Sequence, residues 1–474
     1  MAKLFLEKVT SPLRDKRADT NVRDYVKELL ASQSLPPEEL AALQRVRLEA
    51  LLRVCAETVP AYRLPEDETA DTPAAFWKTV RPLTRAALRN HGGDYLAAGA
   101  DRETLIPAMT GGTSGPPARF FTDRVTAERH EAARQRGLSW WGVKPGSRGA
   151  VLWGSPREWE RFGGKEARRR EWWLKDRLVL PACPLRAADM AEHIRKLNRF
   201  RPAYIMGYAS SLYAFAQRME AKGLILDFTP KVVLSAYEML FDFQRETIAR
   251  AFACPVASEY SARDAGVLAF ECPQGGLHIA SENVLLEVLE PEGFVPMPVG
   301  QTGLLAVTDL NNLSMPRLRY VLGDMAALSG VPCSCGLSLP LLVPPEGRVE
   351  ELLLTPWGRL VHGHAFVRLA RLSPSVRRFQ LVQRGPERVV LKIDRDLSRP
   401  EDDTEEFIAK ARSMLPGMTV DVLMADDIPL TPSGKHCYAL REPDPDFDEA
   451  PEPSPDLDLD LDFDSDYPAP EAGA

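Results

Sequence analysis

The chain lacks any apolar run approaching the roughly 18–20 consecutive residues that are needed to cross a bilayer. Its N-terminal segment, MAKLFLEKVTSPLRDKR, has neither a long apolar core nor a small-residue cleavage site, so we expect no signal peptide. Cysteine is also scarce. Seven cysteines, an odd number, are scattered through 474 residues without the spacing of a disulfide framework. These absences predict reduced thiols and a cytoplasmic protein that does not enter a membrane.

Positive charge is missing from one end of the chain. From Glu442 onward there are 13 Asp and Glu and no Lys or Arg, whereas residues 1–441 carry 59 basic and 54 acidic groups (67 minus 13). So small a positive excess gives no case for nucleic-acid binding. The tail repels itself and can bury little apolar surface, so we predict that it is disordered.

The remaining composition is typical of a globular protein, with 45% hydrophobic and 27% charged residues. Strand-like runs alternate with segments of helical pattern, and the runs fall at 150–154, 177–183, 203–208 and 231–237. This alternation predicts an α/β fold, with a large multi-layer N-terminal domain of mainly parallel sheets. A short helix, a hairpin, a second helix and a strand follow after residue 349, which predicts a small C-terminal α+β domain. We place the domains at 1–346 and 347–441, followed by the tail at 442–474.

A Gly- and hydroxyl-rich segment lies between two strand-like runs: Thr110-Gly111-Gly112-Thr113-Ser114-Gly115-Pro116-Pro117. Backbone N–H groups in such a turn can converge on a phosphate, and Ser or Thr hydroxyls add further donors. The segment lacks the Gly-Lys-Ser/Thr of a Walker loop, so a phosphate site here would belong to another kind of fold. The alternative is an ordinary turn, because the same residues dominate turns for conformational reasons.

Three other segments place a charged residue in a turn or at a strand end. Asp264 in YSARDAG can hold Mg²⁺ through its carboxylate. Asp324 in YVLGD can accept hydrogen bonds from ribose hydroxyls. Lys435 in IPLTPSGK suits an anionic transition state. Each has an ordinary alternative, since loop Asp residues often cap helices and an exposed Lys is usually solvated.

In their order along the chain, these segments resemble the motifs of the adenylate-forming superfamily, and within it those of the phenylacetate–coenzyme A ligase family. The resemblance covers residues 36 to 441 and includes a hinge-like GRVEE at 347–351 and SAYEML at 235–240, similar to the family's Gly-Ala-Glu segment. It implies a two-step reaction. A carboxylate first attacks ATP to form an acyl-adenylate, and a thiol then displaces AMP. It also implies that the C-terminal domain is a mobile lid that rotates between the steps.

The resemblance assigns roles residue by residue. The phosphates of ATP would be held by Thr110, Gly112, Thr113, Ser114 and Gly115. The rest of the nucleotide would meet Glu238, Tyr260, Asp324 at the ribose, and Arg348 at the hinge. Asp264 would bind Mg²⁺, and Lys435 would bridge the acyl carboxylate and the α-phosphate. The substrate pocket would include Tyr208, Ser210 and Ala236.

The chain departs from the family pattern at informative places. Pro116 stands where many relatives carry Lys, and Arg263-Asp264 replaces Thr-Glu, so the carboxylate is one methylene shorter. These changes leave adenylation of a small, aromatic carboxylic acid as the leading function. They leave the acceptor open between coenzyme A, a carrier-protein thiol and an amine. The alternative from another class is a degenerate relative that binds nucleotide without catalysis. Nothing in the sequence indicates an oligomeric state.

Two cysteine-containing segments predict a structural zinc site. Cys272-x5-His278 and Cys333-x-Cys335 together supply three thiols and one imidazole, enough for closed tetrahedral coordination. Their spacing matches no standard zinc finger, although related ligases carry similar Cys/His pairs. The alternative is a set of buried reduced thiols.

Overall fold

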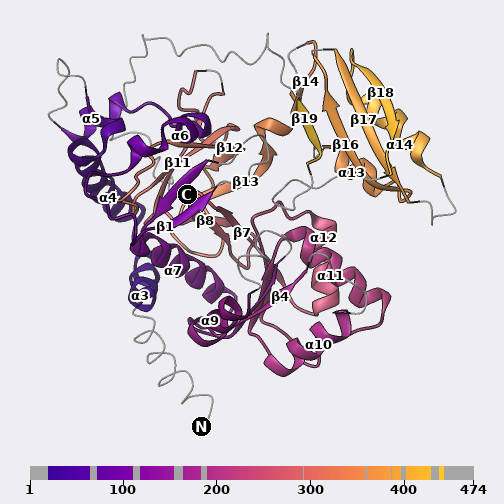
Figure 1. Cartoon of the computed structure of the whole chain (residues 1–474), viewed down its shortest axis with the longest axis horizontal. Helices are drawn as coiled ribbons and strands as arrows, with labels where there is room; N and C mark the ends of the chain where they lie inside the picture. Colours follow the sequence, from indigo (N-terminus) through magenta and orange to yellow (C-terminus); the bar gives the residue numbers. More distant parts are fainter. Residues whose placement is uncertain are drawn as a thin grey trace, which may run out of the picture.

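The computed structural model describes residues 20–64, 72–109, 118–153, 164–182, 189–291, 293–357, 360–363, 365–385, 387–396, 402–426, 428 and 437–441. Figure 1 shows a large body and a smaller orange-to-yellow unit at the upper right. An 11-stranded sheet runs through the body, and a 4-stranded sheet forms the core of the smaller unit. The segment at 110–117, Lys435 and the acidic tail lie outside the described residues.

One half of the large sheet is parallel, in the order β4-β3-β5-β6-β7. Its strands are β3 (Gly149–Trp153), β4 (Arg177–Pro181), β5 (Tyr204–Gly207), β6 (Val232–Ala236) and β7 (Val256–Ala262). The helices associated with this half are α7 (Arg124–Trp140), α9 (Lys165–Lys175), α10 (Asp189–Phe200), α11 (Ala209–Ala221) and α12 (Asp242–Phe252). The α/β class predicted from the alternating sequence pattern is confirmed.

Helices cover both faces of this parallel half. Successive strand residues point to opposite faces, so Leu152 of β3 packs with α10, α11 and α12, whereas Val151 packs on the face that α7 covers. A bidentate ion pair also ties α7 to β7, with Arg134 nitrogens 2.7 and 2.8 Å from the Glu259 carboxylate oxygens. Both faces are therefore dry, which explains why these strands are nearly continuously apolar in the sequence.

The other half of the sheet is antiparallel and continues from β7 in the order β8-β9-β13-β12-β11-β10. Its strands are β8 (Gly266–Glu271), β9 (Leu277–Ile279), β10 (Val284–Leu289), β11 (Gly303–Asp309), β12 (Tyr320–Ser329) and β13 (Leu341–Arg348). The N-terminal helices α3 (Val22–Ser32), α4 (Pro37–Thr58), α5 (Pro73–Thr79) and α6 (Arg85–His91) precede the sheet in the chain. Residues of α4 and α5 share a hydrophobic cluster with Leu310 and Leu318.

The antiparallel half curves strongly between β7 and β12. Three strands separate these two in the sheet order, yet the Tyr260 hydroxyl of β7 reaches the Asp324 carboxylate of β12 at 2.7 Å. Neighbouring strands lie about 4.8 Å apart, so a flat sheet would keep these residues well separated. The registers of β7 with β8 and of β12 with β13 both shift, and the second shift falls where β13 carries Pro344 and Pro345. Such irregularities bend strands and redirect side chains.

A separate hairpin carries the Gly-rich segment. The strands β1 (Ile106–Met109) and β2 (Arg119–Thr122) pair antiparallel, and Met109 lies opposite Arg119. Residues 110–118 therefore connect two paired strands, as the sequence predicted. Phe120 of β2 is buried in the cluster that includes Leu83, Leu88 and Tyr320.

The smaller unit has its own hydrophobic core. Its sheet order is β18-β17-β16-β19, and the helices α13 (Ala365–Arg371) and α14 (Thr404–Ser413) contribute to the same cluster. The strands are β16 (Val376–Gln383), β17 (Arg388–Arg395), β18 (Thr419–Met424) and β19 (Ala439–Arg441), preceded by the hairpin of β14 (Leu352–Leu354) and β15 (Leu360–His362). The expectation that the strand near 418–424 completes this unit misses β19, a three-residue strand that is too short to show periodicity. The boundary predicted at residue 347 lies inside β13.

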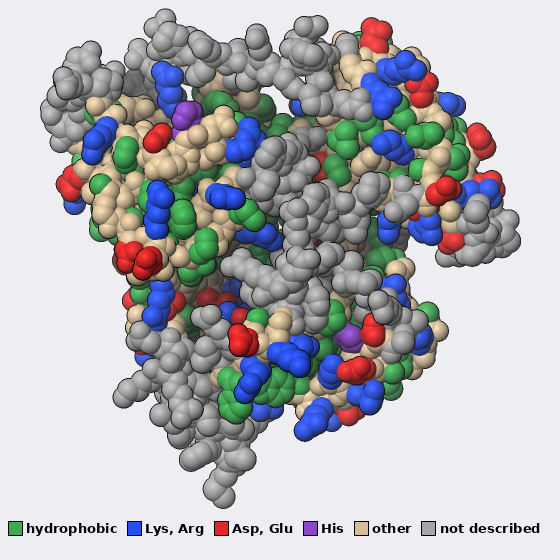
Figure 2. Space-filling view, in the orientation of Figure 1, with side chains coloured by type: hydrophobic (Ala, Val, Ile, Leu, Met, Phe, Trp, Pro, Cys, Tyr) green, Lys and Arg blue, Asp and Glu red, His purple; other side chains and the backbone are tan. Residues whose placement is uncertain are grey.

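The described residues include no membrane-spanning helix, and the face drawn in Figure 2 shows no basic stripe. No described helix combines the length and the apolar character needed to span a bilayer. On the face shown in Figure 2, Lys and Arg side chains are interspersed with Asp and Glu. None of the six described cysteines forms a disulfide.

Close packing of α7 against β8 predicts a stability effect at Gly137. A Cβ added there would lie 2.2 Å from the buried ring of Phe270. We expect Gly137→Ala to lower the free energy of unfolding by about 1–3 kcal/mol, because overpacking outweighs the gain in helix propensity. Gly93→Ala is the control, since a Cβ at Gly93 meets nothing within 4 Å. Urea unfolding of both variants tests this, and a Gly137→Ala protein as stable as wild type would contradict it.

Candidate active site

Three of the residues predicted to bind nucleotide form one hydrogen-bonded cluster. Asp324 lies in β12 directly opposite Arg348 at the end of β13. Its Oδ1 is 3.3 Å from Arg348 Nε, and its Oδ2 accepts a hydrogen bond of 2.7 Å from the hydroxyl of Tyr260. The preceding Gly323 has φ of 81°, a conformation that favours glycine. Asp324 is thereby held by both of its oxygens.

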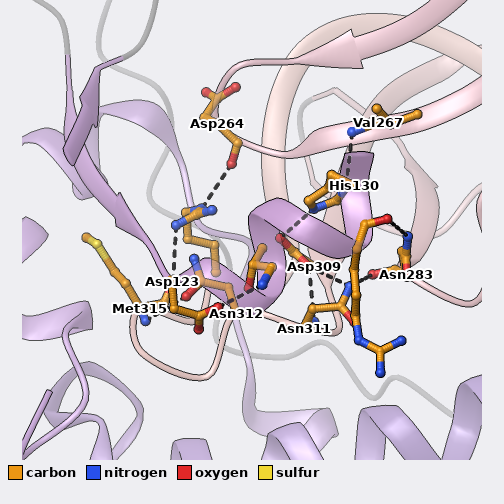
Figure 3. Close-up of polar contacts among 12 residues, drawn as sticks. Asp123, His130, Asp264, Val267, Asn283, Asp309, Asn311, Asn312 and Met315 are labelled. Carbon is orange, nitrogen blue, oxygen red and sulfur yellow. Dashed lines mark hydrogen bonds and ion pairs between the residues drawn. The ribbon is translucent and has the colours of Figure 1, made fainter. Parts of the chain in front are cut away.

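Asp264, the predicted Mg²⁺ ligand, lies beside this cluster in the tight turn between β7 and β8. Its Oδ2 accepts a hydrogen bond of 2.7 Å from the hydroxyl of Tyr320, the first residue of β12. Asp264 and Tyr320 are buried, and Tyr260 is partly buried against the same hydrophobic cluster. Figure 3 shows the Asp264 carboxylate pointing away from the loop that carries Asn312 and Met315.

Burial keeps both tyrosines in the protonated form. It raises the pKa of Tyr260 well above its usual value, and the Asp324 carboxylate raises it further, against an opposing effect of Arg348. Burial likewise raises the pKa of Tyr320, with a second contribution from Asp264. Each tyrosine therefore remains a hydrogen-bond donor to a carboxylate throughout the neutral range.

His130 of α7 supports the turn that carries Asp264. The backbone N–H of Val267 donates to Nδ1 of His130 at 3.1 Å, so the ring proton is on Nε2, which faces Asp309 Oδ2 at 3.1 Å (Figure 3). Gly266 has φ of 76°, and a Cβ there would lie 2.3 Å from the His130 ring. Only glycine fits this turn.

The residues predicted for the substrate pocket lie at the neighbouring strand ends. Glu238 follows β6 and accepts a hydrogen bond of 2.9 Å from the backbone N–H of Ser210 in α11. Tyr208 ends the β5–α11 connection, and its ring meets that of Tyr237 edge to face, with centroids 6.0 Å apart. Ala236, the last residue of β6, is fully buried and pairs with Glu259.

The carboxyl ends of parallel strands are where α/β sheets bind ligands. The described site therefore joins Glu238, Tyr260, Asp264, Asp324 and Arg348 around those ends, next to Tyr208 and Ser210. Thr110, Gly112, Thr113, Ser114, Gly115 and Lys435 lie outside the described residues. Sequence reasoning missed Tyr320 as a partner of Asp264, although it is the first residue of the YVLGD motif.

The four residues predicted to bind zinc converge at one end of the antiparallel half. Their ligand atoms all lie within 4.8 Å of one another. Cys272 Sγ is 3.6 Å from Cys333 Sγ, and His278 Nε2 is 3.1 Å from Cys335 Sγ. Two thiolates on one tetrahedral zinc ion are about 3.8 Å apart, given Zn–S bonds of about 2.3 Å. The donor set and its spacing thus fit zinc.

Neighbouring backbone groups also fix the orientation of these four residues. His278 Nδ1 lies 3.1 Å from the carbonyl of Leu339, so Nδ1–H donates there and the Nε2 lone pair faces the thiols. Gly276 approaches Cys333 so closely that a Cβ would lie 2.6 Å from its sulfur. The turn between Cys272 and Gly276 is closed by two backbone hydrogen bonds.

Solved structures share this architecture. 2-Hydroxyisobutyryl-CoA ligase in the postadenylation state, in complex with 2-HIB-AMP, matches with a TM-score of 0.67 and 18% identity over 87% of this chain and 91% of that chain. The same enzyme in complex with 2-HIB-AMP and CoA in the thioesterification state matches with a TM-score of 0.56, again at 18% identity over 87% of this chain and 91% of that chain. The amide bond synthetase McbA from Marinactinospora thermotolerans matches with a TM-score of 0.51 and 16% identity over 70% of this chain and 68% of that chain. The chain therefore shares the fold of these adenylate-forming enzymes.

Two curated proteins are similar to the chain in sequence, whereas no family model matches it. Phenylacetate-coenzyme A ligase from Thermus thermophilus is 26% identical over 345 residues, which cover 68% of this chain and 73% of the relative. Protein CapK from Staphylococcus aureus is 26% identical over 231 residues, about half of each protein (48% and 49%). The resemblance to the phenylacetate–coenzyme A ligase family that the motifs indicated is confirmed.

Proposed function

We propose that this protein is an AMP-forming acid–thiol ligase. It uses ATP to activate a small, aromatic carboxylic acid and transfers the acyl group to coenzyme A. The main observation behind this proposal is that Tyr260, Asp324 and Arg348 contact one another at the strand ends. The similarity to phenylacetate-coenzyme A ligase supports this choice of substrates.

The Asp324 cluster suits the ribose of a nucleotide. A carboxylate offers about four lone-pair sites, and the bonds from Tyr260 and Arg348 use two of them. The remaining sites can accept the two hydroxyls of a ribose. Because Tyr260 and Arg348 hold the carboxylate in place, little side-chain freedom is lost when the nucleotide binds. Glu238, held by the Ser210 N–H, would line the neighbouring part of the nucleotide pocket.

The first step joins the acid to AMP. A carboxylate oxygen attacks the α-phosphorus of ATP, the bond to the bridging oxygen of the β-phosphate breaks, and pyrophosphate leaves. Lys435 would contact the acyl carboxylate and the α-phosphate and stabilise the charge that develops between them. Asp264 would hold Mg²⁺, which neutralises phosphate oxygens when it is bound. Residues 110–115 would supply N–H and hydroxyl donors to the phosphates.

The second step transfers the acyl group. The sulfur of coenzyme A attacks the acyl carbonyl, the bond to the AMP phosphate oxygen breaks, and AMP leaves while the thiol proton passes to solvent. We propose that residues 347–441 act as the lid that withdraws Lys435 between the steps. Arg348, in the last position of β13, would then lie at the hinge and contact the nucleotide. A carrier-protein thiol or an amine could replace coenzyme A without change to the first step.

Loss of Lys435 tests the first step. We expect carboxylate-dependent ATP–pyrophosphate exchange with a panel of small acids, and a fall of at least about a hundredfold in Lys435→Ala, because a developing negative charge loses its partner. Thioester formation from a preformed acyl-adenylate should change by no more than a few fold. Product analysis with coenzyme A and with hydroxylamine identifies the acceptor.

Lys410→Ala is the matched control for this experiment. Lys410 is also in the smaller unit, but it lies exposed on α14 and pairs with Glu406 at 2.6 Å. Its exchange rate should equal that of wild type. Absence of exchange with every acid, or normal exchange in Lys435→Ala, would favour the non-catalytic relative over the ligase.

We also propose that Cys272, His278, Cys333 and Cys335 hold a structural zinc ion. Four protein ligands close the coordination sphere, so the metal would stabilise the fold and take no part in the reaction. The site would join the β8–β9 turn to the segment before β13, which are otherwise linked by the short pairing of β9 with β13.

Metal analysis of the purified protein tests this zinc site. We expect about one zinc per chain, and chelation should lower the melting temperature. Cys335→Ser should lose the metal, whereas Cys437→Ser, which alters a thiol in the smaller unit that donates to the Ala439 carbonyl, should keep it. Less than about half an equivalent in the wild-type protein would refute the site.

A further inference from the structure

The buried guanidinium of Arg317 contacts the backbone of the Asp264 turn. The side chain of Arg317 is in the loop before β12, and the residue is only 3% exposed. Its Nε donates to the backbone carbonyl of Asp264 at 3.1 Å. One of its terminal nitrogens donates to the carbonyls of Met315 at 3.1 Å and Phe121 at 3.4 Å. Its carbon centre also lies 5.0 Å from the centroid of the Phe120 ring.

No carboxylate lies within ion-pair distance of Arg317 among the described residues. Its partners are neutral carbonyls and an aromatic face, which satisfy hydrogen bonds but leave the positive charge uncompensated at close range. The field of this charge nevertheless extends to Asp309. Burial raises the pKa of Asp309, but His130 first and Arg317 in addition lower it, so the net shift is downward. Burial of a cation without an ion-pair partner lowers the stability of the folded protein.

Arg317 joins two segments that are far apart in the chain. One is the Asp264 turn. The other is β2, which follows directly after the Gly-rich segment at 110–117. The peptide groups of Phe121 are fixed to the same loop by two further bonds, from Asn312 Nδ2 to the Phe121 carbonyl at 3.0 Å and from the Phe121 N–H to Met315 Sδ at 3.1 Å. Asn312 and Met315 are themselves bonded to each other (Figure 3).

We propose that Arg317 is a positioning residue of the nucleotide site. It holds the Asp264 turn at a fixed place relative to the strand that leaves the Gly-rich segment, and it places a permanent positive charge at the backbone carbonyl of Asp264. This inference rests on the proposed function, because it takes the ligand to be a magnesium–triphosphate. The Gly-rich segment has Pro116 and no Lys of its own. A fixed cation beside β2 would supply part of the positive charge that a lysine would otherwise bring to the triphosphate.

The geometry separates this role from that of a ligand to the substrate. Arg317 contacts the backbone of Asp264, whereas the Asp264 carboxylate accepts a hydrogen bond from Tyr320. Figure 3 shows this carboxylate pointing away from the loop that carries Asn312 and Met315. Arg317 would therefore act on magnesium–nucleotide binding through the placement of Asp264. It should have no direct effect on the acid, whose predicted pocket lies at the ends of β5 and β6.

The experiment compares Arg317→Met and Arg317→Lys with wild type. Binding of ATP in the presence and absence of Mg²⁺ is measured by titration calorimetry, and KM values for ATP and for the best acid are measured by pyrophosphate exchange. For Arg317→Met we expect at least about a tenfold weaker affinity for ATP with Mg²⁺ and a higher Mg²⁺ requirement, the size typical of a lost charge-assisted contact. The KM for the acid should change by less than about twofold. Arg317→Lys should be intermediate, because it keeps the charge but not the fork of donors.

Arg319→Met is the matched control. Arg319 is equally buried at 2% exposed, but its guanidinium pairs with Glu287 and lies over the ring of Trp77, away from Asp264. The Arg319→Met protein should be less stable than wild type in urea unfolding, and its affinity for ATP with Mg²⁺ should stay within about twofold of the wild-type value. If Arg317→Met and Arg317→Lys lose stability but retain wild-type ATP affinity and Mg²⁺ dependence, Arg317 has a structural role only and the proposal is wrong.

The calorimetric measurement needs no acid, so the two proposals can fail separately. Wild-type protein that binds ATP with Mg²⁺ but exchanges pyrophosphate with no acid would refute the ligase function. The effect of Arg317→Met on ATP binding would still decide the positioning role. Wild-type protein that binds no ATP would overturn both.

Discussion

Two tyrosine–aspartate hydrogen bonds hold the candidate site together. Tyr260 of β7 reaches Asp324 of β12, and Tyr320 at the start of β12 reaches Asp264 in the turn after β7, each at 2.7 Å. The two bonds run in opposite directions between the same two parts of the sheet. They connect the end of the parallel half to a strand that lies beyond three intervening strands in the antiparallel half. The rest of the site depends on this closure, because Arg348 is positioned through its pairing with Asp324.

The layers around the sheet support that closure from both sides. His130 of α7 fixes the Gly266 end of the Asp264 turn, and Arg317 fixes its backbone from the loop before β12. Both contacts are buried, and both use directional hydrogen bonds. The role proposed for Asp264 at a metal–phosphate complex would depend on such support, because a preorganised group stabilises developing charge without having to rearrange. The proposed zinc site would provide comparable support elsewhere, by joining the β8–β9 turn to the segment before β13.

Much of the fold followed from local pattern. The alternation of apolar strands with helices predicted the parallel half, where β3, β5 and β6 lie within one or two residues of the expected runs. The connection from Met109 to Arg119 followed from Gly and Pro between two strand-like runs. Less predictable were β19, which has only three residues, and the antiparallel order of β8 to β13, because strand pairing depends on long-range contacts that local periodicity does not encode.

The sequence by itself determined the chemical groups of the site and their order along the chain, because each motif is a local arrangement of residue types. It therefore sufficed to predict Asp264, Tyr260, Asp324 and Arg348, and the four Cys and His residues of the zinc-type cluster. Only the tertiary structure decided which of these groups meet. The partnership of Tyr320 with Asp264 and the buried position of Arg317 arise from the curvature of the sheet between β7 and β12. That curvature depends on register shifts and packing across the whole body, which no single segment of sequence specifies.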